Sequence, residues 1–216
     1  MKQITLLYLS ILLAFTGGCG LSSGLESEKM NQESIPDTEA FKDEFTRGFM
    51  KSNKETEEGF YTFESRTEAY SMLFPVNAIV SDIEYDVDGD SFESFSIGED
   101  KEEENYSYYI KVIFEDKKTT NNISSKLHVL SDMAGYTGEY REKSGEEYNV
   151  YYAAKEEMSY GKIAVTYLAY IEDTGTDKAI SLNFNGGCTD KEKPCGLDSK
   201  NINESFEKIV ESLIFK

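Results

Sequence analysis

KIAVTYLAYI, at residues 162–171, is the stretch of sequence that decides the fold. Its odd-numbered positions carry Ile, Val, Tyr, Ala and Ile, and its even-numbered positions include Ala164, Leu168 and Tyr170. Because successive residues of a strand point to opposite faces, both faces of this strand are apolar. A strand that is covered on both faces is a central one, under helices or a second layer. We therefore expect a sheet with helices packed on its faces.

Strands with the same two-residue period lie on both sides of this stretch. The clearest is residues 106–115, in which the alternate positions from Tyr106 to Phe114 are apolar or aromatic. Apolar residues at helical spacing predict helices at residues 123–133 and 202–213. Short turns between neighbouring strands favour antiparallel pairing. We predict an α+β fold, a single antiparallel sheet flanked by helices. Its other strands are predicted at residues 60–64, 70–74, 91–97, 138–143, 148–154 and 179–185.

An amphipathic helix is predicted before the first strand. Phe41, Phe45 and Phe49 recur at every fourth residue, and acidic residues stand where the first turn would be. The polar face mixes acidic and basic side chains, unlike the basic face of a helix that lies in a membrane surface. We expect one helix of about 15 residues within residues 36–52, docked on the domain through its Phe side chains.

Residues 1–19, MKQITLLYLSILLAFTGGC, have the organisation of an export signal. Lys2 precedes an apolar run over residues 4–15, shorter than the roughly 20 residues of a membrane-spanning helix, and two glycines lead to Cys19. This order resembles the lipobox of bacterial lipoproteins, although Thr16 stands where Leu is commonest. The resemblance implies cleavage before Cys19, which then carries a diacylglycerol thioether and an N-acyl chain. The alternative is an ordinary signal peptide with a chance cysteine.

The lipid would fix the chain to a bilayer. Each buried methylene contributes about 0.8 kcal/mol, and two acyl chains anchor stably where one does not. We expect a signal peptide at residues 1–18, a lipidated disordered tether at 19–35, the helix at 36–52 and a globular α+β domain at 59–216. The expected location is the extracytoplasmic face of the cell membrane of a Gram-positive host, with the lipid bilayer as partner.

Two segments of the domain resemble PsbP-like lipoproteins. Tyr70-Ser-Met-Leu-Phe-Pro75 matches an aromatic-Ser-apolar run that ends in Pro, and residues 206–210 match a closing helix with a Phe and an Ile-Val pair. That family usually has a Trp shortly after the Pro, and this chain has no Trp. The resemblance implies a PsbP-like sandwich over residues 60–216. It implies no specific activity, because the family includes non-enzymatic binding and assembly factors.

Two cysteines remain if Cys19 carries lipid. Cys188 and Cys195 lie in the polar stretch NGGCTDKEKPCG. An exported chain meets an oxidising compartment, so we predict a structural disulfide. Closing so short a loop stabilises by on the order of 2.5 kcal/mol at best. A redox-active pair is the alternative, but the spacing is not the C-x-x-C of thiol oxidoreductases, and a zinc site lacks further ligands nearby.

The charge balance excludes one class of partner. The chain has 41 acidic and 22 basic residues, a net charge of -19, which repels phosphates and anionic headgroups. We therefore expect no nucleic acid partner. Asp86, Asp88 and Asp90 alternate along one stretch and could bind calcium through hard oxygen ligands. An EF-hand register beginning at Glu84 places Phe95 where a bidentate Glu is required, so a solvated acidic turn is the alternative.

No motif marks the chain as an enzyme, and we predict that it is not one. It lacks H-E-x-x-H and a Gly-rich nucleotide loop. The only His, His128, falls within the predicted helix at residues 123–133. Beyond the lipid on Cys19, no cofactor is expected.

The tyrosines are the remaining candidates for a function. Tyr109 and Tyr151 fall opposite the main apolar rows of their strands, and we expect them to be exposed and to offer binding area. We predict a non-catalytic binding or interaction domain of the cell envelope, with a ligand or an envelope protein as its partner. The alternatives are an extracytoplasmic hydrolase with an unrecognised site and a calcium-dependent binding module at residues 84–93.

Overall fold

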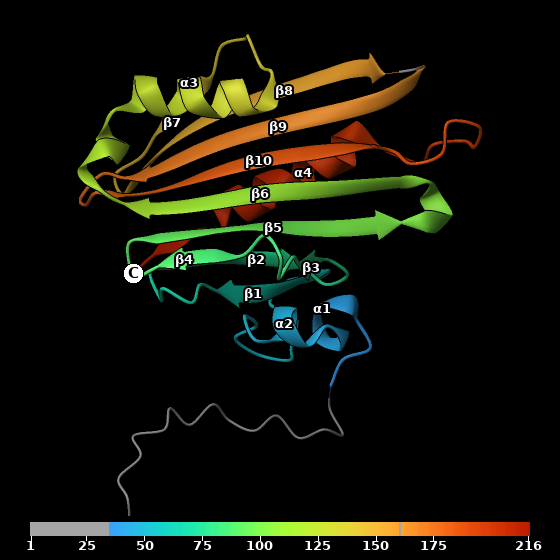
Figure 1. Cartoon of the computed structure of the whole chain (residues 1–216), viewed down its shortest axis with the longest axis horizontal. Helices are drawn as coiled ribbons and strands as arrows, with labels where there is room; N and C mark the ends of the chain where they lie inside the picture. Colours follow the sequence, from blue (N-terminus) through green and yellow to red (C-terminus); the bar gives the residue numbers. More distant parts are fainter. Residues whose placement is uncertain (1–34, 160) are drawn as a thin grey trace, which may run out of the picture.

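Two antiparallel sheets form the frame of the computed structural model, which describes residues 35–159 and 161–216 (Figure 1). The larger sheet has eight strands in the order β3-β5-β6-β10-β9-β8-β7, with β4 also paired to β5. The smaller sheet has the order β1-β2-β11. The predicted α+β class and antiparallel pairing are confirmed, and the prediction of a single sheet is wrong. Cys19, the predicted signal peptide at 1–18 and nearly all of the predicted tether at 19–35 lie outside the described residues.

The elements follow the chain in nearly the predicted order, with three additional short strands, β3, β4 and β11. The strands are β1 Phe60–Glu64, β2 Tyr70–Pro75, β3 Ile79–Val80, β4 Asp86–Asp88, β5 Phe92–Lys101, β6 Tyr106–Asp116, β7 Arg141–Ser144, β8 Tyr148–Ser159, β9 Lys162–Asp173, β10 Lys178–Cys188 and β11 Ile214–Phe215. The helices are α1 Glu39–Lys42, α2 Glu44–Arg47, α3 Ile123–Ala134 and α4 Ser199–Glu211, with 3-10 turns η2 Glu102–Glu104 and η3 Lys118–Asn121.

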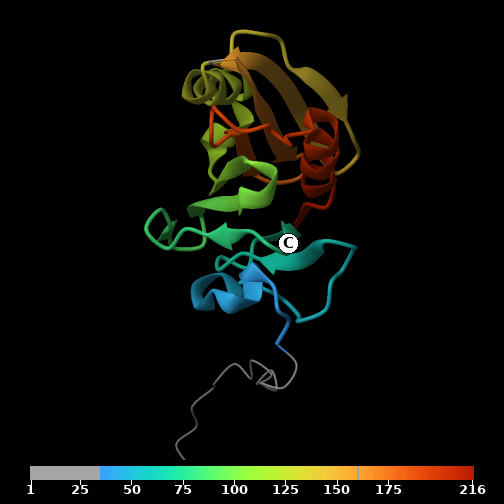
Figure 2. The same ribbon diagram turned by 90° about the vertical axis from the view of Figure 1, so that its right-hand side faces the viewer.

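Strand β9 is central, as its sequence predicts. Val165 and Tyr167 point into the main core, which also contains Phe206 of α4. Leu168 and Tyr170 point into a second cluster, which lies beneath α3. Figures 1 and 2 show α3 and α4 on opposite faces of the large sheet. Within the described part of the chain, no helix combines the length and the apolar character needed to span a bilayer.

Aromatic packing explains why the β1–β2 hairpin forms its own sheet. Phe63 of β1 stacks on Phe95 of β5 with ring centroids 5.1 Å apart, and Tyr70 of β2 lies 5.3 Å from Phe114 of β6. The hairpin therefore packs its face against the large sheet and does not extend the large sheet's ladder. Burying aromatic rings of this size contributes more to stability than two additional ladder bonds would.

The chain before β1 forms two single-turn helices, so the prediction of one long helix within 36–52 is wrong. Asp43 has an extended backbone, with φ -76° and ψ 120°, and separates α1 from α2. Its side chain accepts a hydrogen bond from the Thr46 amide at 2.7 Å, which caps α2 and favours the break. Phe41 and Phe49 are buried in the main core, and Phe45 packs at its edge.

Candidate functional site

A cavity of ≈ 520 Å³ lies where α4 meets the large sheet and the end of the β1–β2 hairpin, and we call it the α4 cavity. Its floor is apolar and comes from both layers. The residues are Ile202, Phe206 and Ile209 of α4, Ile110 of β6 and Phe184 of β10. A hollow of this volume with an apolar floor is within the range of small-molecule sites in proteins.

Polar side chains line the end of the α4 cavity next to the β5–β6 turn. Glu99 and Lys101 come from β5, and Tyr108 and Tyr106 stand opposite them on β6 as cross-strand pairs. Residues two apart on a strand share a face, so the antiparallel ladder places all four side chains on the cavity side.

Glu99 is held by its two neighbours. The Tyr108 hydroxyl donates to Glu99 Oε2 at 2.6 Å, and Lys101 Nζ lies 3.1 Å from Oε1. The Glu99 side chain is only 9% exposed. Burial, followed by the negative charge of Glu99, raises the pKa of Tyr108 well above its usual value. The Tyr108 phenol therefore stays protonated and remains a hydrogen-bond donor at neutral pH.

Tyr106 has an unused hydroxyl in the same place. The residue is 7% exposed and lines the α4 cavity, yet its hydroxyl has no hydrogen-bond partner among residues 35–159 and 161–216. Burial and then the charges of Glu104, Glu99 and Asp198 raise the pKa of Tyr106 to about 12. This neutral phenol is free to donate a hydrogen bond to a ligand or to accept one from it.

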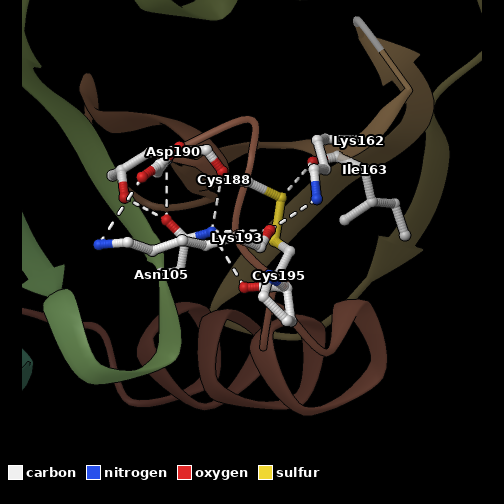
Figure 3. The surroundings of a disulfide bond; sticks show 9 residues. Asn105, Lys162, Ile163, Cys188, Asp190, Lys193 and Cys195 are labelled. Atoms are coloured by element: carbon white, nitrogen blue, oxygen red, sulfur yellow. Dashed lines mark hydrogen bonds and ion pairs between the residues drawn. A yellow bond between two sulfur atoms is a disulfide. The ribbon is translucent and has the colours of Figure 1, made fainter.

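The rim of the cavity is built by the loop between β10 and α4. A disulfide joins Cys188 to Cys195, with their Cα atoms 5.7 Å apart. Asn105, in the left-handed conformation at φ 55°, reaches into this loop (Figure 3). Its Nδ2 donates to the carbonyls of Asp190, Lys193 and Pro194 at 2.9, 3.2 and 3.0 Å. The β5–β6 turn therefore fixes the loop in which sequence analysis predicted the disulfide.

The same loop sets the start of α4. The Gly196 amide donates to the Glu104 carbonyl at 2.7 Å, and a Cβ at Gly196 would lie 2.9 Å from that oxygen, so the close approach requires glycine. Asp198 then caps α4 by accepting from the amides of Lys200 and Asn201. These contacts position the α4 wall of the cavity relative to β5 and β6.

The predicted calcium ligands do not converge. Asp86 and Asp88 lie in β4, and Asp90 in the following turn, all exposed. An extended strand separates alternate carboxylates by about 7 Å, too far for one ion to bind both directly. No group of three His, Cys, Asp or Glu side chains in the described chain could hold a metal ion. The proposed metal site at Asp86, Asp88 and Asp90 therefore lacks the geometry that calcium requires.

The strand pattern predicts that Tyr109 and Tyr151 are exposed binding residues. Tyr109 is 51% exposed, as predicted. Tyr151 instead packs against the cluster beneath α3, with its ring 6.4 Å from that of Tyr170. Tyr106 and Tyr108 fall in the main apolar row of their strand. Strand alternation predicts on which face a side chain lies, but it does not predict whether neighbouring side chains fill that face completely. The available signal was the charged residues that stand opposite them, Glu99 opposite Tyr108 and Lys101 opposite Tyr106.

Several known proteins resemble this chain. A lipoprotein of Bacillus subtilis (strain 168), "Putative lipoprotein YvcA", is 27% identical over 235 residues, covering 100% of this chain and 97% of the relative. The crystal structure of the Saccharomyces cerevisiae Ran-binding protein Mog1p aligns with a TM-score of 0.47 and 16% identity over 72% of this chain and 95% of that one. A Bacteroides thetaiotaomicron structure aligns with a TM-score of 0.39 and 13% identity, over 72% and 48%.

A family model covers nearly the whole described domain. It matches residues 36–214 and carries the description "Putative lipoprotein YvcA". The match supports the prediction of a lipoprotein, and it does not show the resemblance to PsbP-like lipoproteins that the motif at 70–75 indicated. The chain belongs to the YvcA_Mog1p family of lipoproteins.

Proposed function

We propose that this lipoprotein is anchored at the extracytoplasmic face of the cell membrane by lipid on Cys19, and that its domain binds a small molecule without catalysing a reaction. The observation that supports binding is the α4 cavity, whose apolar floor ends at a group of hydrogen-bonding side chains. Sites for small molecules commonly combine an apolar lining with a few polar groups in this way.

The lining favours recognition over hydrolysis. Tyr106 and Tyr108 retain their protons because their pKa values are raised, so they serve as hydrogen-bond donors and not as bases at neutral pH. Ser205, the serine of the lining, donates to the Asn201 carbonyl at 3.0 Å. Nucleophilic catalysis needs a base within hydrogen-bond reach of the nucleophile. His128 lies on α3, across the large sheet, with a side chain that is 76% exposed.

The anchor is tested by labelling cells with an alkyne analogue of palmitate. The wild-type chain should be labelled and remain in the membrane fraction, whereas Cys19→Ala should be unlabelled and leave it. Cys188→Ala with Cys195→Ala is the matched control and should remain labelled. If Cys19→Ala kept both its label and its membrane fraction, the anchoring proposal would be wrong.

The cavity is tested with a fluorescent reporter. The chain has no Trp, so Ser205→Trp at the cavity rim introduces the only one. Glu204→Trp, on the same helix but outside the cavity lining, is the matched control. With lipidated protein in phosphatidylcholine vesicles, 4-phenylbutylamine, 4-phenylbutanol and 4-phenylbutyrate are titrated in turn. At least one should change the emission of the Ser205→Trp protein in a saturable way, without changing that of the control. No saturable change with any of the three would contradict a binding cavity.

A further inference from the structure

We propose that the α4 cavity binds an amphipathic amine, whose apolar part packs against Phe184 and Phe206 and whose ammonium group meets the Tyr106 hydroxyl between Glu99, Glu104 and Asp198. This inference rests on the proposed binding function and names the class of ligand. Three features of the cavity support it: the apolar floor, the Tyr106 hydroxyl and the negative charge of the lining.

The floor selects the apolar part of the ligand. Phe184 and Phe206 lie with ring centroids 5.8 Å apart, and Tyr108 stacks on Phe184 at 5.0 Å. These rings pack on one another in the cavity lining, where Phe184 is 3% and Phe206 1% exposed. A short aryl or alkyl group laid on this surface would remove apolar area from water, which is the main source of affinity in such a site.

The Tyr106 hydroxyl selects a hydrogen-bonding group at the far end. The hydroxyl makes no hydrogen bond within the described chain, so a ligand group in the cavity can bond to it in place of water. A phenol oxygen accepts a hydrogen bond from an ammonium N–H. Tyr106 is 7% exposed and lines the cavity, so a group inside the cavity can approach its side chain.

The charge at this end of the cavity determines whether the polar group of the ligand should be positive or negative. Glu99, Glu104 and Asp198 supply three carboxylates to the lining, and Lys101 is its only ammonium group. Lys101 is already paired with Glu99 at 3.1 Å. The remaining negative charge would repel a carboxylate or phosphate and attract a protonated amine. The separation between the aromatic floor and this acidic end therefore fits a ligand with a cationic head and an apolar body.

The three 4-phenylbutyl probes differ only in their end groups and so measure this preference directly. With the Ser205→Trp reporter in vesicles, and empty vesicles as the blank, we expect 4-phenylbutylamine to bind at least ~10-fold more tightly than 4-phenylbutyrate. Adding Tyr106→Phe should weaken amine binding about 5-fold, the effect of one hydrogen bond. Tyr109→Phe, on the opposite face of the same strand, is the matched control and should leave the affinity unchanged.

Each outcome is decisive for the ligand class. If the butyrate or the alcohol binds as tightly as the amine, the amine inference is overturned while the binding cavity stands. If none of the probes binds, both the amine inference and the proposed binding cavity are contradicted. If Tyr106→Phe lowers the melting temperature more than Tyr109→Phe does, its effect is structural. Glu104→Gln then decides, because it should weaken binding of the amine and not of the alcohol.

Discussion

The Asn105 side chain donates from Nδ2 to the carbonyl oxygen of Pro194 at 3.0 Å, joining the β5–β6 turn to a residue inside the disulfide loop. Asn105 Oδ1 also accepts from the Thr189 hydroxyl at 2.9 Å and from the Asp190 amide at 2.8 Å. One buried side chain thus satisfies polar groups along the whole loop. The loop beside the α4 cavity is in this way tied to the β5–β6 turn at several points.

Replacing Asn105 should destabilise the fold strongly. Asn105→Ala removes these hydrogen bonds and replaces Asn, which tolerates the left-handed region, with a residue that tolerates it less well, at a combined cost of about 3 kcal/mol. Asn105→Gly loses the same bonds without the backbone strain and should cost about 2 kcal/mol. Urea unfolding followed by circular dichroism measures both values. If Asn105→Ala unfolds at the wild-type urea concentration, Asn105 does not hold the loop.

Removing the disulfide should destabilise the fold only moderately. Cys188→Ala with Cys195→Ala should lower the free energy of unfolding by about 2 kcal/mol, the effect of opening a short loop. Combined with Asn105→Ala, the total loss should be about 1 kcal/mol smaller than the sum, because both features fix the same loop. Strict additivity in a double-mutant cycle would contradict a shared role.

Glu93 should tolerate the loss of its charge. The residue is 0% exposed, and its Oε1 accepts from the Tyr85 hydroxyl at 2.6 Å and the Arg66 amide at 3.0 Å. Its Oε2 and the Tyr70 hydroxyl are buried without partners in the described chain. Glu93→Gln relieves the desolvated charge and offers an amide to Tyr70, so we expect about 1 kcal/mol of added stability.

Glu93→Ala is the contrasting variant for this position. It leaves the Tyr85 hydroxyl and the Arg66 amide unpaired and should cost about 3 kcal/mol, because two buried donors lose their acceptor. Thermal unfolding of the two variants beside the wild type gives the comparison. A Glu93→Gln protein that melts well below the wild type would mean that the charge itself stabilises this part of the core.

Stability should fall in alkaline solution. Burial is the first cause that raises the pKa of both Tyr106 and Tyr167 to about 12, whereas an unfolded Tyr titrates near pH 10. Below about pH 10 both states hold these protons, and the stabilisation is fully present. Between about pH 10 and about pH 12 the unfolded state releases them first, so the free energy of unfolding decreases as pH rises.

The titration can be followed directly. Urea unfolding across this pH range measures stability, and the absorbance of tyrosinate reports when each class of phenol ionises. Tyr106→Phe should make the decrease shallower, while Tyr109→Phe, an exposed neighbour, should not. A stability that stayed constant up to pH 12 would contradict the assigned direction of these shifts.

Long strands were predictable because their pattern is repeated over many residues. Strands β6 and β9 each span more than ten residues. Strand β6 keeps a two-residue apolar period over that length, and β9 is a long run that is apolar on both faces. Strands β3 and β11 have two residues each, which is too few for a period to be seen. Asp43 broke the predicted N-terminal helix through a local cap, which competes with helix propagation and is invisible to spacing.

The cavity was not predictable, because it depends on contacts between distant segments. The Cys188–Cys195 pair could be inferred from the number of cysteines and the expected compartment. The sequence could not predict that Asn105, more than 80 residues earlier, fixes this loop. The second sheet likewise arises from the packing of Phe63 on Phe95, which only the folded chain brings together.

The pairing of β11 with β2 has a consequence for the order of folding. Phe215 stands opposite Tyr70, so the small sheet takes its outer strands from both ends of the described chain. A polypeptide that emerges from its amino terminus, at a ribosome or a secretion pore, can close this sheet only after residue 215 has emerged. Helix α4 arrives just before it, so a nascent chain would have neither this ladder nor the α4 wall of its cavity until these residues have emerged.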